Sequence, residues 1–108
     1  MIAEKDKPMF DTLREVAKKV VPTGGQVWLY GSRARGEARA DSDWDILVII
    51  NTDKIRNEDY NRFADPFYDL GLEYDAVINP ILRTSEEWSK FSYLPLFQNI
   101  QREGIEIC

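Results

Sequence analysis

The chain has 108 residues, a hydrophobic fraction of 44% and a net charge of −5, which together indicate one domain with a core of its own. It contains no histidine, so a Ser-His-Asp triad, a zinc–histidine site and imidazole acid–base catalysis are excluded. The one cysteine, Cys108, cannot form an internal disulfide, which is typical of a reducing compartment. Catalysis would therefore depend on carboxylates, hydroxyls, cations or a bound metal.

Neither a membrane nor duplex nucleic acid is indicated as a partner. The longest apolar run, Ile46–Ile50, is far shorter than the roughly 20 residues of a membrane span. Residues 1–6 lack the apolar stretch of a signal peptide. No basic run exceeds the pair Lys18-Lys19, so a broad electrostatic footprint for nucleic acid is not visible. We therefore expect a cytoplasmic protein with no membrane partner and without nonspecific binding to DNA.

The first half of the chain predicts helix, strand, turn, helix and strand. Apolar residues recur at helical spacing over residues 5–20, which predicts an amphipathic helix. Residues 26–30 predict a short strand that ends at Gly31, and a short helix is expected over 33–40. Residues 43–50 have a β-branched, apolar end, which predicts a buried central strand with acidic residues at its exposed mouth.

The pattern continues with a helix and a strand in the second half. Residues 58–70 predict a helix with one apolar face, although Pro66 argues against a straight one. Residues 72–78 predict the next strand, and Pro80 marks its edge or its end.

The carboxyl-terminal part predicts two more helices. Thr84 and Glu87 have the spacing of a capping box, which predicts a helix start. A helix is expected over 95–102, followed over 105–107 by a brief last strand or a tail. The whole pattern predicts an α/β fold in which a small mixed β-sheet is flanked by helices, in a single domain over residues 1–108.

The strongest functional signal is Gly31-Ser32 followed, after ten intervening residues, by Asp43 and Asp45. A glycine lets the backbone approach a phosphate closely, and a serine at a helix start adds a hydroxyl and N–H groups. Alone, Gly31-Ser32 would more often be an ordinary strand-to-helix turn, and the two aspartates a solvated strand end. The combination indicates a site for a nucleoside triphosphate and its metal ions.

The acidic residues predict a cation site. Asp43 and Asp45 are two positions apart on a strand, so their Cα atoms lie roughly 6.6 Å apart on one face. If Asp75 on the neighbouring strand faces the same way, three carboxylates converge, and each pair at about 5 Å repels by about 3 kcal/mol at an effective dielectric of 20. Oxygen ligands favour Mg²⁺, with Mn²⁺ as an alternative, over zinc or copper. Glu73 is the rival for the third position.

Three arginines lie beside this motif. Arg33, Arg35 and Arg39 would ordinarily form a solvated helix face, but they could also bind a small polyanion. Arg35 is the candidate for contact with a phosphate group.

The segment Gly31–Asp45 closely resembles the signature of the polymerase-beta-like nucleotidyltransferase superfamily, and it looks most like the minimal nucleotidyltransferase family. Residues 74–77 resemble that family's strand with the third carboxylate, and residues 98–105 resemble its usual carboxyl-terminal ending. The resemblance thus extends in outline over the whole chain and implies the nucleotidyltransferase fold.

The resemblance also implies a role for each matched residue. Gly31 and Ser32 would hold the triphosphate, and Asp43 and Asp45 would bind the metal ions. Asp75, or Glu73 in its place, would complete the metal site and act as the base toward the incoming hydroxyl.

The implied function is transfer of AMP from ATP, with magnesium, to a hydroxyl of a partner protein. Minimal members are commonly paired with a small helical HEPN-type partner, so the resemblance implies the antitoxin of such a toxin. Larger relatives add a substrate domain that is not expected here, so another subunit or protein would supply the acceptor. One alternative is a noncatalytic antitoxin or interaction module that binds its partner, with or without nucleotide. Another is transfer to a nucleic acid or a small molecule.

Overall fold

A four-stranded mixed sheet forms the middle layer of the protein. The computed structural model describes residues 2–108, and Met1, the first residue of the amino-terminal stretch considered above, lies outside them. The strands are β1 (Gln26–Tyr30), β2 (Trp44–Ile50), β3 (Ile78–Thr84) and β4 (Ile105–Glu106). The helices are the 3₁₀ helix η1 (Glu4–Asp6) and α1 (Lys7–Val20), α2 (Ser32–Arg35), α3 (Asn57–Phe63), α4 (Asp65–Glu73), α5 (Ser85–Lys90) and α6 (Pro95–Glu103).

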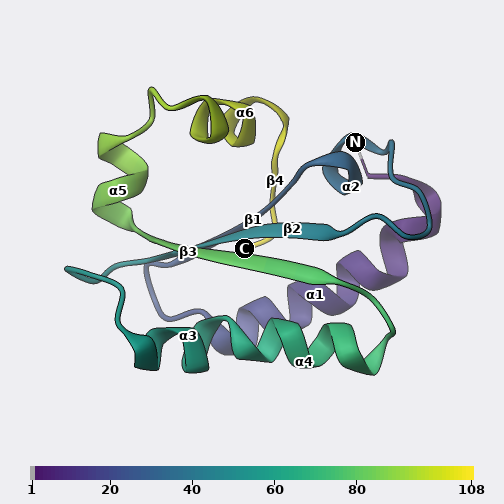
Figure 1. The fold of residues 1–108 in the computed structure, drawn as a ribbon, viewed down its shortest axis with the longest axis horizontal. Coiled ribbons are helices and arrows are strands. Elements are labelled where there is room, and N and C mark those ends of the chain that lie inside the picture. Colours follow the sequence, from purple (N-terminus) through teal and green to yellow (C-terminus); the bar gives the residue numbers. More distant parts are fainter. Residues whose placement is uncertain (1) are drawn as a thin grey trace.

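The strand order β3-β2-β1-β4 places β2 and β1 at the centre. β1 pairs antiparallel with β2 and with β4, whereas β2 and β3 are parallel and are joined by a crossover through α3 and α4. Helices α1, α3 and α4 cover one face of the sheet, and α5 and α6 lie on the other (Figure 1). The prediction of a small mixed sheet flanked by helices is confirmed. No helix within residues 2–108 is long and apolar enough to cross a membrane.

The amino-terminal elements lie close to their predicted positions. The helix expected over 5–20 is a 3₁₀ turn followed by α1, whose first turn contains Pro8, where a missing N–H costs little. The strand over 26–30 is confirmed. The helix expected over 33–40 is only one turn, α2, because Gly36 adopts a left-handed conformation with φ of 75° and ends it.

The predicted helix over 58–70 is two helices. α3 ends at Phe63 and α4 begins at Asp65, with Pro66 in its first turn. A proline in the interior of one continuous helix would remove a backbone hydrogen bond, whereas the start of a helix tolerates it.

The prediction of a strand over residues 72–78 is wrong. Leu72 and Glu73 are the last residues of α4, and Asp75 lies in the turn after it, with a φ of 53°. A short polar side chain tolerates this left-handed conformation, so Asp75 helps to end the helix. The strand starts only at Ile78 and continues through Pro80, which β3 tolerates because it is an edge strand.

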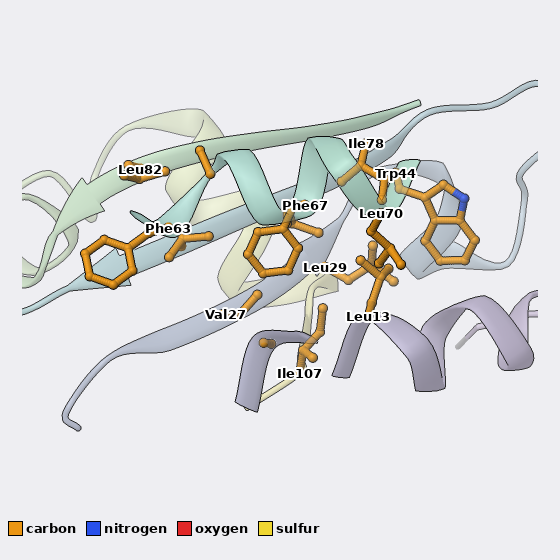
Figure 2. Close-up of a cluster of buried hydrophobic side chains, with 14 of the residues drawn as sticks. Leu13, Val27, Leu29, Trp44, Phe63, Phe67, Leu70, Ile78, Leu82 and Ile107 are labelled. Atoms are coloured by element: carbon orange, nitrogen blue, oxygen red, sulfur yellow. The ribbon is translucent and has the colours of Figure 1, made fainter. Parts of the chain in front are cut away.

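Side chains of β2 alternate between two apolar clusters. Trp44, Ile46, Val48 and Ile50 belong to the larger core beneath α1, α3 and α4. Figure 2 shows this core, with Leu13, Phe67 and Leu70 pointing from the helices toward the strands. Leu47 and Ile49 belong instead to the smaller cluster formed with α5 and α6. The ring of Trp88 packs against the rings of Trp28 and Phe97 in this cluster, tilted by 41° and 56° to them.

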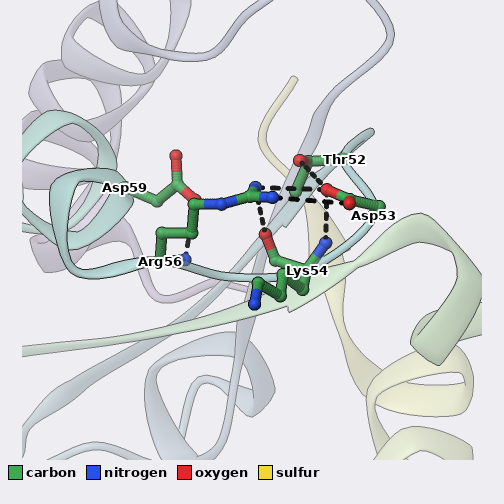
Figure 3. A network of polar contacts seen from close by, with 5 residues as sticks. All are labelled: Thr52, Asp53, Lys54, Arg56 and Asp59. Atoms are coloured by element: carbon green, nitrogen blue, oxygen red, sulfur yellow. Dashed lines mark hydrogen bonds and ion pairs between the residues drawn. The ribbon is translucent and has the colours of Figure 1, made fainter.

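A polar network holds the loop between β2 and α3 (Figure 3). The Arg56 guanidinium donates a hydrogen bond of 3.1 Å to Asp53, and the Arg56 backbone N–H donates one of 2.9 Å to Asp59. The hydrogen bond from Arg56 lowers the pKa of Asp53 below its ordinary value. Both partners of this ion pair are well exposed, so solvent screens it and the network orders a surface loop rather than the core.

Two leucines of α4 should respond very differently to truncation. Leu70 is 6% exposed in the core, so Leu70→Ala should lower the free energy of unfolding by about 2–5 kcal/mol. Leu72 is 83% exposed, so the matched variant Leu72→Ala should change it by less than about 0.5 kcal/mol. Urea unfolding followed by circular dichroism would measure both, and equal losses would contradict the packing described here.

Candidate active site

The turn after β1 brings the backbone close to an acidic side chain. Gly31 has a φ of 76°, a conformation that favours glycine. A Cβ atom at this position would lie 2.7 Å from Oδ2 of Asp45, so a larger residue would crowd that carboxylate. The Gly31 carbonyl accepts hydrogen bonds from the N–H groups of Ala34 and Arg35, which leaves the first N–H groups of α2 without helical partners. Ser32, half-buried, is the first residue of that turn.

The structure brings Asp43 and Asp45 together through a third residue. Asp43 immediately precedes β2, Asp45 is its second residue, and Asn79 of β3 is the register partner of Asp45. The Asn79 amide Nδ2 donates hydrogen bonds of 2.9 Å to Asp43 Oδ2 and 3.5 Å to Asp45 Oδ1. Both carboxylates therefore lie within reach of one amide group at the open end of the sheet.

Asp45 lies in an electrostatically unfavourable place. Burial raises its pKa above the ordinary value and the charge of Asp43 raises it further, while the hydrogen bond from Asn79 opposes both. Tyr30 is the partner of Asp45 on β1, and its pKa is raised by burial first and by the Asp45 charge second. A cation bound between the two carboxylates would relieve this repulsion.

Asp75 does not join the pair. Because the chain turns at Asp75 rather than forming a strand, this residue lines a hollow with Arg33, Ser42 and Val77 instead. A second hollow places it beside Trp44, whose side chain belongs to the opposite face of β2 from Asp45. Within residues 2–108, no group of three or more His, Cys, Asp or Glu side chains is close enough to hold a metal ion. The expected convergence of three carboxylates was wrong.

The position predicted for Glu73, the alternative third carboxylate, is also wrong. The prediction put it on a strand face beside Asp75, but it is exposed on the last turn of α4. The sequence analysis missed Asn79, which occupies the position opposite Asp45. Asn79 lies opposite Asp45 only because β3 begins at Ile78. The sequence did not predict that strand, since Pro80 indicated the edge or end of an earlier one.

Arg33 is not part of a solvated helix face, which corrects the expectation for this residue. It is 6% exposed, its Nη1 donates a hydrogen bond of 2.8 Å to Asp6, and its guanidinium lies 4.7 Å from the centre of the Trp44 ring. Its Nη2 donates hydrogen bonds to the carbonyl oxygens of Ala40, at 3.2 Å, and Ser42, at 2.8 Å. Arg33 therefore fixes the loop that delivers Asp43.

Arg35, the candidate phosphate contact, is engaged with acidic side chains. Its guanidinium is partly exposed and pairs with Glu37 at 3.4 Å and with Glu103 at 3.5 Å. These contacts link α2 to the end of α6. A phosphate contact by Arg35 stays a prediction and would compete with both pairs.

Comparison with known proteins identifies the family. A family model described as "Nucleotidyltransferase domain" matches residues 11–100, which include the glycine turn, both aspartates and Asn79. This chain belongs to that family. It is a nucleotidyltransferase, and the expected resemblance is confirmed.

Individual relatives agree with the assignment. Over 79 residues this nucleotidyltransferase is 32% identical to a protein of Methanocaldococcus jannaschii named "Putative protein adenylyltransferase MJ0604", and the match covers 73% of each chain. A toxin–antitoxin structure with AMP-PNP contains a chain with a TM-score of 0.66 at 18% identity, over 92% of this chain and 72% of that one. A complex of tri-AMPylated Shewanella oneidensis HEPN toxin with MNT antitoxin gives 0.62 at 16% identity, over 95% and 71%. At such identities the structures establish a shared fold.

The glycine turn yields a prediction with a matched control. Gly31→Ala and Gly24→Ala both place a side chain at positive φ, so each should cost roughly 1–2 kcal/mol of stability. Only the Cβ at position 31 would crowd Asp45, because nothing lies within 4 Å of the one at position 24. We expect Gly31→Ala alone to weaken binding of Mg²⁺-ATP, measured by calorimetry beside thermal unfolding. Equal binding by both variants would contradict a site at Gly31.

A second prediction concerns the buried ion pair. Arg33→Met leaves Asp6 charged and buried, so it should lower stability by about 3–5 kcal/mol. Arg35→Met removes a partly exposed guanidinium and should cost less than about 1 kcal/mol. Chemical unfolding would measure both. Restoration of much of the lost stability by Asp6→Asn in the Arg33→Met background would confirm that the loss comes from the unpaired charge.

Proposed function

We propose that this nucleotidyltransferase transfers AMP from ATP to a hydroxyl group of a partner protein and acts as the antitoxin of a small helical HEPN-type toxin. One observation carries the proposal: Asp43 and Asp45 lie beside the Gly31 turn, so carboxylate oxygens that suit a metal ion and a backbone turn that suits a phosphate are at the same end of the sheet. A triphosphate needs both, because its charge must be neutralised while its reacting phosphorus is held in place.

The relatives support the acceptor and the nucleotide. The Methanocaldococcus jannaschii relative carries the name of a protein adenylyltransferase. Neighbours in fold include a toxin–antitoxin structure with AMP-PNP and an MNT antitoxin in complex with a tri-AMPylated HEPN toxin. These names favour ATP over other nucleotides and a protein over a small molecule as the acceptor.

The residues of the site fit a hard divalent cation. Carboxylate oxygens of Asp43 and Asp45 are preferred ligands of Mg²⁺ or Mn²⁺, and the repulsion that raises the pKa of Asp45 favours a bound positive charge. When bound, such an ion neutralises the developing charge on the phosphates and lowers the pKa of a coordinated hydroxyl.

The chain's own residues position the reactants. The N–H groups at the start of α2 and the Ser32 hydroxyl bind phosphate oxygens, and Gly31 leaves room for them. The acceptor hydroxyl oxygen attacks the α-phosphorus and forms a new P–O bond. The bond from the α-phosphorus to the bridging oxygen breaks, pyrophosphate leaves with the electron pair, and the hydroxyl proton passes to water.

The alternative is a noncatalytic antitoxin that binds its partner without transfer. The arrangement within residues 2–108 gives this alternative some support, because two carboxylates rather than three converge. Under this alternative, removal of the carboxylates would leave neutralisation of the toxin unchanged.

The test is transfer to a small helical HEPN-type protein. The two purified proteins are incubated with Mg²⁺ and ATP, and the intact mass of each chain is measured. We expect a nucleoside-monophosphate increment on the partner, lost in Asp43→Asn/Asp45→Asn and retained in the control Asp11→Asn/Asp41→Asn. The control removes the same two charges from exposed positions.

Two results would reject the proposal. The first is retention of the increment in Asp43→Asn/Asp45→Asn. The second is that the wild type adds no increment to the partner while Asp43→Asn/Asp45→Asn still neutralises the toxin in cells. That result would establish the noncatalytic alternative. Omission of Mg²⁺, with EDTA added, should abolish transfer as completely as the double substitution.

A further inference from the structure

The residue opposite the acidic pair is an amide, and its place is set by the sheet. β2 and β3 are parallel, and their register pairs Asp45 with Asn79 and Leu47 with Ile81. Along β3 the buried positions are Ile78, Pro80, Leu82 and Thr84, so the positions between them face the side of the sheet that carries Asp45. A carboxylate on β3 could therefore approach Asp43 and Asp45 only from position 79.

The Asn79 side chain can donate hydrogen bonds, which an ionised carboxylate cannot. An ionised carboxylate only accepts hydrogen bonds, whereas an amide NH₂ group donates two. The Asn79 Nδ2 uses this capacity on both acids, at 2.9 Å to Asp43 and 3.5 Å to Asp45. A third carboxylate at this point would instead add repulsion to two groups that already repel each other.

We propose that Asn79 is a positioning residue that holds Asp43 and Asp45 together before a cation binds, without adding a third carboxylate to the site. This inference rests on the proposed function, because it takes the aspartate pair as the cation site. Such a site binds a divalent ion weakly by itself and more tightly when a triphosphate supplies further oxygens. Turning the amide over presents Oδ1, itself a suitable ligand for a hard cation.

The consequence for chemistry is that position 79 takes up no proton. An amide is not a base at neutral pH, and Asp75 lies on the opposite side of β2 from the pair. The acceptor's proton therefore goes neither to Asn79 nor to Asp75.

The test measures cation binding without nucleotide or partner. Mn²⁺ is titrated into the wild type, Asn79→Asp and Asn61→Asp, and free Mn²⁺ is followed by electron paramagnetic resonance. Asn61 is exposed on α3, so its variant adds the same charge away from the site. We expect Asn79→Asp to bind Mn²⁺ at least about tenfold more tightly than the wild type, because the added charge faces the ion directly. Asn61→Asp should match the wild type.

Thermal unfolding supplies a second readout, because a purely structural role would not change the rise in midpoint that Mn²⁺ causes. In EDTA, Asn79→Asp should unfold at a lower temperature than the wild type, and Mn²⁺ should raise its midpoint more than that of the wild type. Asn79→Ala has no side-chain donor, so it should also be less stable in EDTA, but without a gain in Mn²⁺ affinity.

Either of two outcomes would overturn the inference: Mn²⁺ affinity of Asn79→Asp no greater than that of Asn61→Asp, or a midpoint in EDTA equal to that of the wild type. Failure of the proposed function looks different, because then transfer is absent while the Mn²⁺ comparison keeps its predicted order. Asp43→Asn in the Asn79→Asp background should remove the gain in affinity, and persistence of the gain would place the cation elsewhere and also overturn the inference.

Discussion

The side-chain alternation of β2 is the constraint on which both the core and the site depend. Trp44, Ile46, Val48 and Ile50 fill the core beneath α1, α3 and α4, so Asp45 has to face the other side. On that side, α5 and α6 cover Leu47 and Ile49 but leave the start of the strand open. A shift of one residue would bury Asp45 in the core and move Trp44 to the open start of the other face, so the packing energy that fixes the register also fixes the position of Asp45.

The loop before β2 depends on a buried charge rather than on apolar packing. Arg33 donates hydrogen bonds to Asp6 and to two carbonyl oxygens, and its guanidinium lies over the Trp44 ring. Removal of one partner of a buried ion pair leaves an uncompensated charge, which makes this contact stringent. The 3₁₀ helix η1, which contains Asp6, thereby helps to support the candidate site, although its residues do not line the aspartate pair.

Several features followed directly from local sequence. The β1 strand, the glycine turn and the acidic start of β2 lie within 20 residues, and their short-range signals agree with one another. The capping box of Thr84 and Glu87 is likewise local, and both of its hydrogen bonds form. The boundary between α4 and β3 failed for the opposite reason: Leu72–Ile78 has strand-like side chains, but packing of α4 against the sheet extends the helix to Glu73.

The sequence by itself determined the family, the order of most elements and the pair of carboxylates, because each of these depends on residues close together in the chain. Only the tertiary structure decided what stands opposite that pair. The position 36 residues after Asp43 meets it through the register of two parallel strands, and register is set by the burial of Ile78, Pro80 and Leu82 together with the crossover through α3 and α4. Such pairing is a property of the packed sheet, so Asn79 replaced the expected Asp75 without any local signal.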